Sequence, residues 1–514
     1  MSKTIIIIGA GLAGLSAALQ AAENGCNVKL VSSLPSERAQ SVMAEGGINA
    51  ALNTKDENDS PEEHFTDTIK AACGLADPNA VWGMTQAAPE LVHWLLKLGV
   101  KFNMSGYDDV DLRNFGGQKK KRTAFAQSDT GKQIMTAMID AVRRKEASGM
   151  VERFSHHSFL TLRLCGNICC GCVIRDEYSQ ETVELPGDAV IVATGGMHGL
   201  FGNTTGSLSN TGEVTAELFR LGVPLANGEM IQYHPTTVKC GGKRMLISEA
   251  ARGEGGRLFA MKDGKQWYFM EEKYPELGNL MPRDITAREI WKVSHESEVF
   301  LDMTEISEKI ISNKLSGLAD DCMTYLHKDI RKEPVSVLPG IHYFMGGILV
   351  DEQHRTPIQN LYAAGECCAQ YHGANRLGGN SLLGALYGGR VAAKSACEQA
   401  DVVDLSCATQ IDFPPASQIS EIKQLNKVMQ ETMGVVRNEN TLLNGIQTVQ
   451  ALTGNLPLLG MAVLKSALAR KESRGAHWRE DYPKSNDDDY LKTTVARFDG
   501  KQIQISFVPV PERR

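Results

Sequence analysis

Four consecutive isoleucines, Ile5 to Ile8, lie near the start of the chain and predict a buried β-strand. A glycine-rich turn follows at residues 9–14 (GAGLAG), and an alanine- and leucine-rich stretch with helical character continues to Gly25. A second apolar run, Val28 to Val31, completes a β-α-β unit. The unit places three glycines at the positions of a dinucleotide fingerprint, where the backbone must approach a pyrophosphate at a helix N-terminus: Gly9, Gly11 and Gly14.

Two later segments repeat the pattern of a buried parallel strand that ends in small residues. The first runs from Ala189 to Val192 and leads into residues 193–196 (ATGG), and the second runs from Leu361 to Ala364 and leads into Gly365-Glu366. One nucleotide site is therefore expected from three distant pieces of the chain. A contiguous NAD site usually has an acidic residue at the end of its second strand, whereas this strand ends in Ser32-Ser33. The discontinuous pattern favours FAD.

The alternation of strands and helices is interrupted between about residues 236 and 340, and helical periodicity dominates from Ile419 to Lys471. We therefore expect an α/β protein with a FAD-binding Rossmann-like domain, an inserted α+β capping domain and a C-terminal helical domain. The expected boundaries are 1–235 and 341–400 for the two parts of the FAD-binding domain, 236–340 for the capping domain and 401–514 for the C-terminal domain.

The 514 residues are 42% hydrophobic and 22% charged, close to ordinary globular usage, so neither a disordered nor a membrane-spanning class is expected. The formal net charge of -7 gives no basic footprint for nucleic acid. No apolar stretch approaches the roughly 20 residues of a membrane span, and the N-terminus has no export cleavage site, so we expect a cytoplasmic protein. No metal site is expected, because the spacing of the densest cysteine group is not that of zinc or iron–sulfur ligands: Cys165, Cys169, Cys170 and Cys172.

Five short motifs combine histidine, arginine and hydroxyl groups with glycines. They are QYHPT at 232–236, SEAARGEGG at 248–256, PRD at 282–284, HYFMGG at 342–347 and HGANRLGGNS at 372–381. Each motif alone is equally compatible with a structural role, such as a buried histidine or an ion pair. Together they suit a substrate with two carboxylates, because guanidinium–carboxylate contacts determine both position and orientation.

These motifs resemble the flavoprotein subunit of succinate dehydrogenase and fumarate reductase, and the similarity extends to Ser473-Arg474-Gly475-Ala476-His477 near the C-terminus. The runs AEGGINAA at 44–51 and Asp59-Ser60-Pro61 are most similar to the enzymes whose membrane anchor is a single diheme cytochrome subunit. The resemblance implies interconversion of fumarate and succinate, with a small dicarboxylate as substrate. It also implies an iron–sulfur subunit and a membrane anchor subunit as partners, which would hold the chain at the cytoplasmic face of the membrane.

The resemblance also implies roles for individual residues. The dicarboxylate would be held against the flavin by Arg376, His234, His342 and Ser248. Arg283 would transfer the proton, Glu249 and Arg252 would form the relay that resupplies it, and hydride would pass through flavin N5. The implied cofactor contacts run from the pyrophosphate and adenosine to the ribityl chain and the ring: Gly9, Gly11, Gly14, Ser33, Ser41, Ala44, Glu45, Gly46, Gly47, Thr194, Gly195, Glu366, Arg376, Ser381 and Leu382.

One departure concerns the flavin linkage. The membrane-bound relatives carry a histidine, in an Arg-Ser-His pattern, that bonds covalently to the flavin, whereas this chain reads Arg38-Ala39-Gln40-Ser41. Because glutamine is no such nucleophile, we expect non-covalent FAD. Loss of the link is expected to lower the flavin potential, and fumarate reduction would then be favoured over succinate oxidation.

Two other functions are considered. L-aspartate oxidase shares several of these motifs and has a glutamate that pairs with the substrate ammonium, but here Phe115 occupies that position in the run RNFGG. An apolar ring leaves a buried ammonium unpaired, which costs several kcal/mol. The second alternative is a non-catalytic flavin-containing electron-transfer or assembly subunit. The complete set of candidate catalytic residues argues against it.

Overall fold

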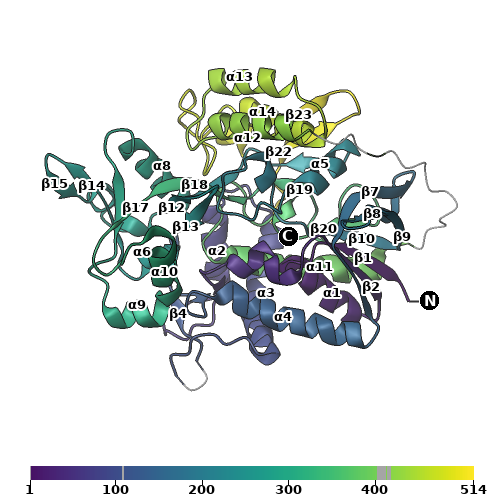
Figure 1. The fold of residues 1–514 in the computed structure, drawn as a ribbon, viewed down its shortest axis with the longest axis horizontal. Helices are drawn as coiled ribbons and strands as arrows, with labels where there is room; N and C mark the ends of the chain where they lie inside the picture. Colours follow the sequence, from purple (N-terminus) through teal and green to yellow (C-terminus); the bar gives the residue numbers. More distant parts are fainter. Residues whose placement is uncertain (1, 107–108, 402–412, 414–417) are drawn as a thin grey trace.

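The computed structural model describes residues 2–106, 109–401, 413 and 418–514. Its centre is a five-stranded parallel sheet in the order β20-β10-β1-β2-β6 (Figure 1). The strands are β1 (Thr4–Ile8), β2 (Asn27–Ser32), β6 (Val151–Ser155), β10 (Ala189–Val192) and β20 (Leu361–Ala363). The three buried runs that the hydrophobic pattern predicted therefore lie side by side in one sheet, although some 170 residues separate each from the next.

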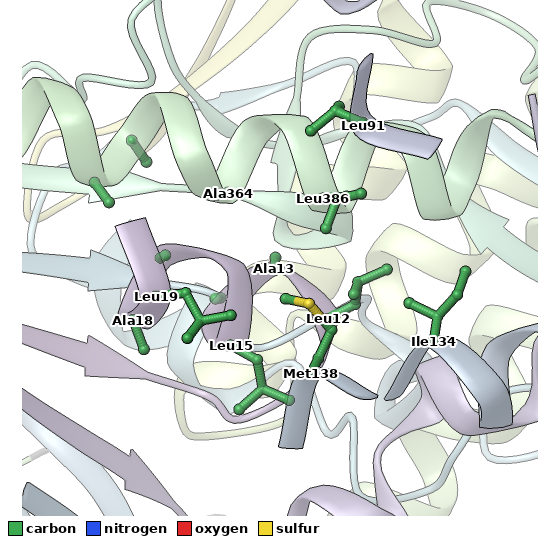
Figure 2. Close-up of a cluster of buried hydrophobic side chains, with 14 of the residues drawn as sticks. Leu12, Ala13, Leu15, Ala18, Leu19, Leu91, Ile134, Met138, Ala364 and Leu386 are labelled. Atoms are coloured by element: carbon green, nitrogen blue, oxygen red, sulfur yellow. The ribbon is translucent and has the colours of Figure 1, made fainter. Parts of the chain in front are cut away.

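Side chains of β1 alternate between two buried layers, as a strand covered on both faces requires. Ile5 and Ile7 pack with one set of helices, whereas Ile6 and Ile8 pack with an antiparallel sheet. The helices are α1 (Leu12–Glu23), α3 (Pro78–Leu98), α4 (Thr130–Ala147) and α11 (Asn380–Gln399), and the sheet is β7 (His157–Cys165), β8 (Ile168–Asp176) and β9 (Thr182–Pro186). Figure 2 shows the helical layer, where leucines of α1 meet Ile134 and Met138 of α4 and Leu386 of α11.

The inserted region contains a four-stranded antiparallel sheet and its own hydrophobic core. The strands are β14 (Arg257–Lys262), β15 (Lys265–Trp267), β16 (Val299–Asp302) and β17 (Val335–Ser336), and the helices include α6 (Glu249–Gly253), α8 (Arg283–Val293), α9 (Glu308–Lys314) and α10 (Ser316–Asp321). These elements lie on the left of Figure 1 and form the α+β capping unit that the sequence predicts.

A three-stranded sheet connects the capping unit to the rest of the molecule. It consists of β12 (Ile231–Cys240), β13 (Lys243–Leu246) and β18 (Leu338–Phe344). The expected boundaries at residues 235 and 340 fall inside β12 and β18, which pair with each other. The boundaries at residues 235 and 340 stay predictions. The boundary at residue 400 also stays a prediction, because it adjoins residues 402–412, which lie outside the described part of the chain.

The C-terminal region begins with the predicted helices α12 (Ile419–Thr432), α13 (Glu439–Val449) and α14 (Asn455–Ala469). The chain then forms a hairpin, β22 (Lys492–Phe498) and β23 (Ile503–Pro509). This hairpin extends a sheet made of β11 (Leu225–Ala226), β19 (Gly347–Leu349) and β21 (Cys368–Ala369), which come from the earlier domain. The C-terminal region is therefore helical in its first half and joins the FAD-binding part through its last strands.

Candidate active site

A cavity of about 960 Å³ opens where the carboxyl ends of the parallel strands meet the connecting sheet. It is large enough for a cofactor and a small substrate together. Nearly all candidate residues line it, from all three parts of the predicted nucleotide site and from the capping unit: Gly9, Gly11, Ser33, Ser41, Ala44, Glu45, Gly46, Gly47, Thr194, Gly195, His234, Ser248, Glu249, Arg283, His342, Glu366, Arg376, Ser381 and Leu382. Two candidates, Gly14 and Arg252, do not line the cavity.

The turn between β1 and α1 has the shape that a dinucleotide requires. Gly9 has φ +110°, and a Cβ atom there would lie 2.3 Å from the carbonyl oxygen of Ala193. Gly11 precedes the first turn of α1, whose open N-terminus faces the cavity. Gly14 lies behind the turn, where a Cβ atom would come within 1.8 Å of the Gly9 carbonyl oxygen, so it serves helix–strand packing instead of cofactor contact. These residues fit a bound FAD.

The middle of the cavity is lined by the segment that follows β2. The carboxyl of Glu45 has one oxygen that is buried without a hydrogen-bond partner in the described structure. Burial, reinforced by Asp321, raises the pKa of Glu45 to about 8, so this side chain is neutral at neutral pH. Glu366 accepts a hydrogen bond from the Phe344 amide at 3.1 Å, which orients its carboxylate at the same cavity.

Arg283 and Glu249 form the most tightly bonded pair in the site. Arg283 is the first residue of α8 after Pro282, and Glu249 is the first residue of α6 after its N-cap, Ser248. Arg283 Nε and Nη2 donate to Glu249 Oε2 at 2.8 and 2.5 Å. Although burial alone would raise the pKa of Glu249, the guanidinium groups of Arg283 and Arg252 hold it below its ordinary value.

Arg252 lies on the far side of Glu249 from the cavity. Its Nη2 is 3.5 Å from Glu249 Oε1, and its Nη1 donates to the carbonyl oxygen of Asn279 at 2.6 Å. The order from the cavity inward is therefore Arg283, Glu249, Arg252. This is the order that the expected proton relay requires.

Two histidines and a second arginine also line the cavity: His234, His342 and Arg376. The rings of His234 and His342 lie 5.1 Å apart, and His342 Nδ1 bonds with Thr205 Oγ1 at 2.8 Å. Burial, followed by the charge of Arg283, holds the pKa of both histidines well below 6.5, so both are neutral. Arg376 lies over the Tyr343 ring at 4.3 Å, and its Nε is buried without a partner in the described structure.

Arg376 is therefore a cation that lacks a counter-charge. No carboxylate of the described residues lies within ion-pair distance of its guanidinium. Burial, followed by repulsion from Arg283, lowers its pKa to about 9. A buried guanidinium held beside neutral hydrogen-bond donors is suited to an anionic ligand.

Two groups in this arrangement were not among the candidates. Gln232 Oε1 accepts from Arg283 Nη1 at 3.0 Å, while its Nε2 donates to Asn375 Oδ1 at 3.0 Å and to the Arg376 carbonyl oxygen at 2.8 Å. The amide of Gly116 donates to Glu249 Oε1 at 2.9 Å. Gln232 could have been found from the alternation of side chains along a strand, which puts it on the same face of β12 as His234. No local pattern in the sequence indicates the Gly116 amide.

The described residues provide neither a metal centre nor a membrane span. They contain no group of three or more histidine, cysteine, aspartate or glutamate side chains placed to hold an ion. Within the same residues, every helix is too short or too polar to cross a bilayer.

Comparison with known proteins identifies the family. The family described as FAD binding domain matches residues 4–382, and the family described as fumarate reductase flavoprotein C-term matches residues 452–513. The succinate dehydrogenase flavoprotein subunit of Bacillus subtilis is 38% identical, covering 100% of this chain and 98% of the relative. The 8-methylmenaquinol:fumarate reductase flavoprotein subunit of Wolinella succinogenes is 32% identical, covering 100% and 92%.

A solved structure of Escherichia coli quinol fumarate reductase has the same fold, with a TM-score of 0.90 and 27% identity over 99% of this chain and 97% of that one. The predicted α/β architecture and the predicted cofactor, FAD, are confirmed by these matches. The chain belongs to the succinate dehydrogenase and fumarate reductase flavoprotein subunits, a family of FAD-dependent oxidoreductases.

Proposed function

We propose that this protein interconverts fumarate and succinate and that it favours fumarate reduction. The observation that carries the proposal is the buried row of Arg252, Glu249 and Arg283, which reaches the cavity that neutral His234 and His342 also line. Bound FAD would supply the hydride chemistry at flavin N5. The protein's own side chains would bind the dicarboxylate, orient it and hold the proton.

The wall of the cavity matches a planar dianion. Arg376 would receive one carboxylate, because its guanidinium is buried without a counter-charge among the described residues. His342, oriented by Thr205, would donate to the same carboxylate. His234 and the hydroxyl of Ser248 would hold the other carboxylate, and both line the same cavity. Contacts at both ends align the carbon–carbon bond with the proton donor.

Arg283 would protonate one carbon of fumarate. A guanidinium in water is a poor acid, so the step needs support from its neighbours. Arg252 would then give a proton to Glu249, and Glu249 Oε2, which accepts two hydrogen bonds from Arg283, would pass that proton on to the Arg283 guanidinium. The three groups then carry one positive charge less until Arg252 takes up a proton from outside, whereas each transfer within the path leaves their net charge unchanged.

The flavin would be held without a covalent bond, because Gln40 lines the cavity where relatives of the membrane-bound group carry the linking histidine. The lower potential expected of an unlinked flavin is the reason for the proposed direction. As partners we propose an iron–sulfur subunit and a membrane anchor subunit. Relatives named as flavoprotein subunits of succinate dehydrogenase and of fumarate reductase are similar to this chain over its full length.

Phe115 argues against L-aspartate as substrate. Its ring is 1% exposed, and a Cβ atom on Gly46 would lie 2.8 Å from Phe115 Cζ. The ring therefore packs against the backbone of the cofactor-binding segment and offers no carboxylate to a substrate ammonium.

The deciding experiment uses the purified, FAD-loaded chain. A reduced artificial dye should be reoxidised on addition of fumarate, and an oxidised dye should be reduced more slowly by succinate. L-aspartate should give no turnover. If reduced flavin in the isolated chain is not reoxidised by fumarate, the protein is a non-catalytic electron-transfer subunit and the proposal is wrong.

A further inference from the structure

Arg244 is a cavity-lining cation for which the proposed reaction has no assigned role. It lies on β13, in the hairpin that links β12 to β13, and it lines the same cavity as His342. The side chain is half-buried. No carboxylate of the described residues is within ion-pair distance of its guanidinium, so its charge faces the cavity uncompensated.

The guanidinium is held in place by the connecting sheet. Its Nε donates to Thr237 Oγ1 at 2.6 Å, and its Nη2 donates to the Leu338 carbonyl oxygen at 3.3 Å. A Cβ atom on Gly340 would lie 2.5 Å from Arg244 Nε, so glycine at this position leaves the space that the guanidinium occupies. The arginine is therefore preorganised across β12 and β18, while Nη1 has no hydrogen bond to a described residue.

The sheet that holds Arg244 also carries His342, which we propose to bind the substrate. Gly340 pairs with His234 across the sheet, and His342 lies two residues further along β18, at an irregularity in the pairing of β18 with β12. The loop at Thr204 and Thr205 is bonded to both neighbours: the Arg244 amide donates to the Thr204 carbonyl oxygen at 3.1 Å, and Thr205 Oγ1 bonds with His342 Nδ1 at 2.8 Å. Arg244 and His342 are therefore both hydrogen-bonded to the loop at Thr204 and Thr205.

We propose that Arg244 is a recognition residue that attracts the incoming dicarboxylate to the wall beside His342. The inference rests on the proposed function and deepens it. A fixed cation on the wall of a low-dielectric cavity raises the local concentration of a dianion before the substrate reaches Arg376. The group takes no part in hydride or proton transfer, so its effect lies in substrate capture.

The test measures steady-state fumarate reduction by the FAD-loaded chain. Arg244→Gln should raise the KM for fumarate about tenfold and leave kcat within about twofold, because charge is lost and the reacting groups are unchanged. Arg244→Lys, which keeps the charge, should keep KM within about threefold. Rising salt should increase the KM of the parent more steeply than that of Arg244→Gln, since screening removes the same attraction. The control is Lys265→Gln, which removes an exposed cation on β15 and should leave KM unchanged.

A second measurement follows binding without turnover. Malonate, a saturated dicarboxylate, should perturb the flavin absorbance with a Kd that rises about tenfold in Arg244→Gln. An unchanged KM and Kd in that variant would overturn the inference and leave the proposed function intact. Equal losses of kcat and melting temperature in Arg244→Gln and Arg244→Lys would also overturn the inference, because they would indicate that Arg244 only stabilises the sheet. A parent chain that neither reduces fumarate nor binds malonate would overturn both proposals.

Discussion

Replacing Arg283 with lysine would change the proposed proton-transfer group and little else. Arg283 makes three side-chain hydrogen bonds, two to Glu249 Oε2 and one to Gln232 Oε1. Its planar guanidinium donates to both partners at once, whereas a lysine has one nitrogen on a stem that cannot match this fork. Arg283→Lys would therefore keep a cation in the site but break the proposed proton path from Glu249 to the substrate carbon.

The expected size of the effect comes from the step that is lost. A positioned general acid contributes roughly 100- to 10,000-fold to a rate, and no other cation of the described residues is bonded to Glu249 on the cavity side. We expect kcat for fumarate reduction to fall by at least about 1,000-fold, equivalent to about 4 kcal/mol in the activation barrier. FAD content should be unchanged, because Arg283 lies on the capping unit and makes no bond to the glycine turn at Gly9.

The assay is single-turnover and steady-state reduction of fumarate at matched FAD occupancy. Arg288→Lys is the control, because Arg288 is on the same helix but stacks on Trp478 at 4.0 Å, away from the relay. That variant should retain near-parental turnover. A purely structural role for Arg283 predicts a flavin-poor protein with a lower melting temperature. Turnover by Arg283→Lys within about tenfold of the parent would remove Arg283 from the mechanism.

Four further outcomes are expected. Acid precipitation should release the yellow flavin from the pellet, because Gln40 offers no covalent link; a fluorescent denatured band would contradict this. Dye-linked assays on one preparation should run faster with fumarate than with succinate, and a flavin midpoint potential above that of the fumarate/succinate couple would refute the proposed direction. Folding raises the pKa of Glu45 from 4.5 to about 8, so unfolding releases a proton between these two pH values and the free energy of unfolding falls as the pH rises through this window. The increase in melting temperature of Glu45→Gln over the parent should therefore be larger at pH 9 than at pH 5. Since His234 and His342 are already neutral well below pH 6.5, kcat/KM for fumarate should show no histidine ionisation between pH 6 and 8.

The parallel sheet was predictable because its strands are continuous apolar runs. Ile5 to Ile8 must be buried on both faces, and only a layered α/β structure covers both. The connecting sheet was not predictable in the same way. β12 and β18 are about 100 residues apart, and their pairing depends on the folded capping unit between them. The expected boundaries therefore fall within two paired strands.

The motifs indicated which residues belong to the site, but they did not indicate which hydrogen bonds those residues form. Histidine, arginine and glutamate beside glycines indicate which segments converge on the cavity. Which atoms bond depends on contacts between residues distant in sequence: Gly116 to Glu249 spans 133 positions, and Arg283 to Gln232 spans 51. Gln232 has no charge or nucleophilic atom, so its residue type alone did not mark it as a candidate.

The charge of the inner wall supports a dianionic substrate independently of any motif. Among the groups proposed to hold the dicarboxylate and the proton, Arg283, Arg252 and Arg376 contribute three positive charges, and Glu249 contributes one negative charge. Both wall histidines are neutral, and Glu45 carries its proton at neutral pH because burial raises its pKa to about 8. The excess among these buried groups is therefore two positive charges, which the two carboxylates of fumarate or succinate would cancel. A monocarboxylate would leave one buried cation uncompensated, so the burial that makes an unpaired Arg376 costly favours a second carboxylate on the substrate.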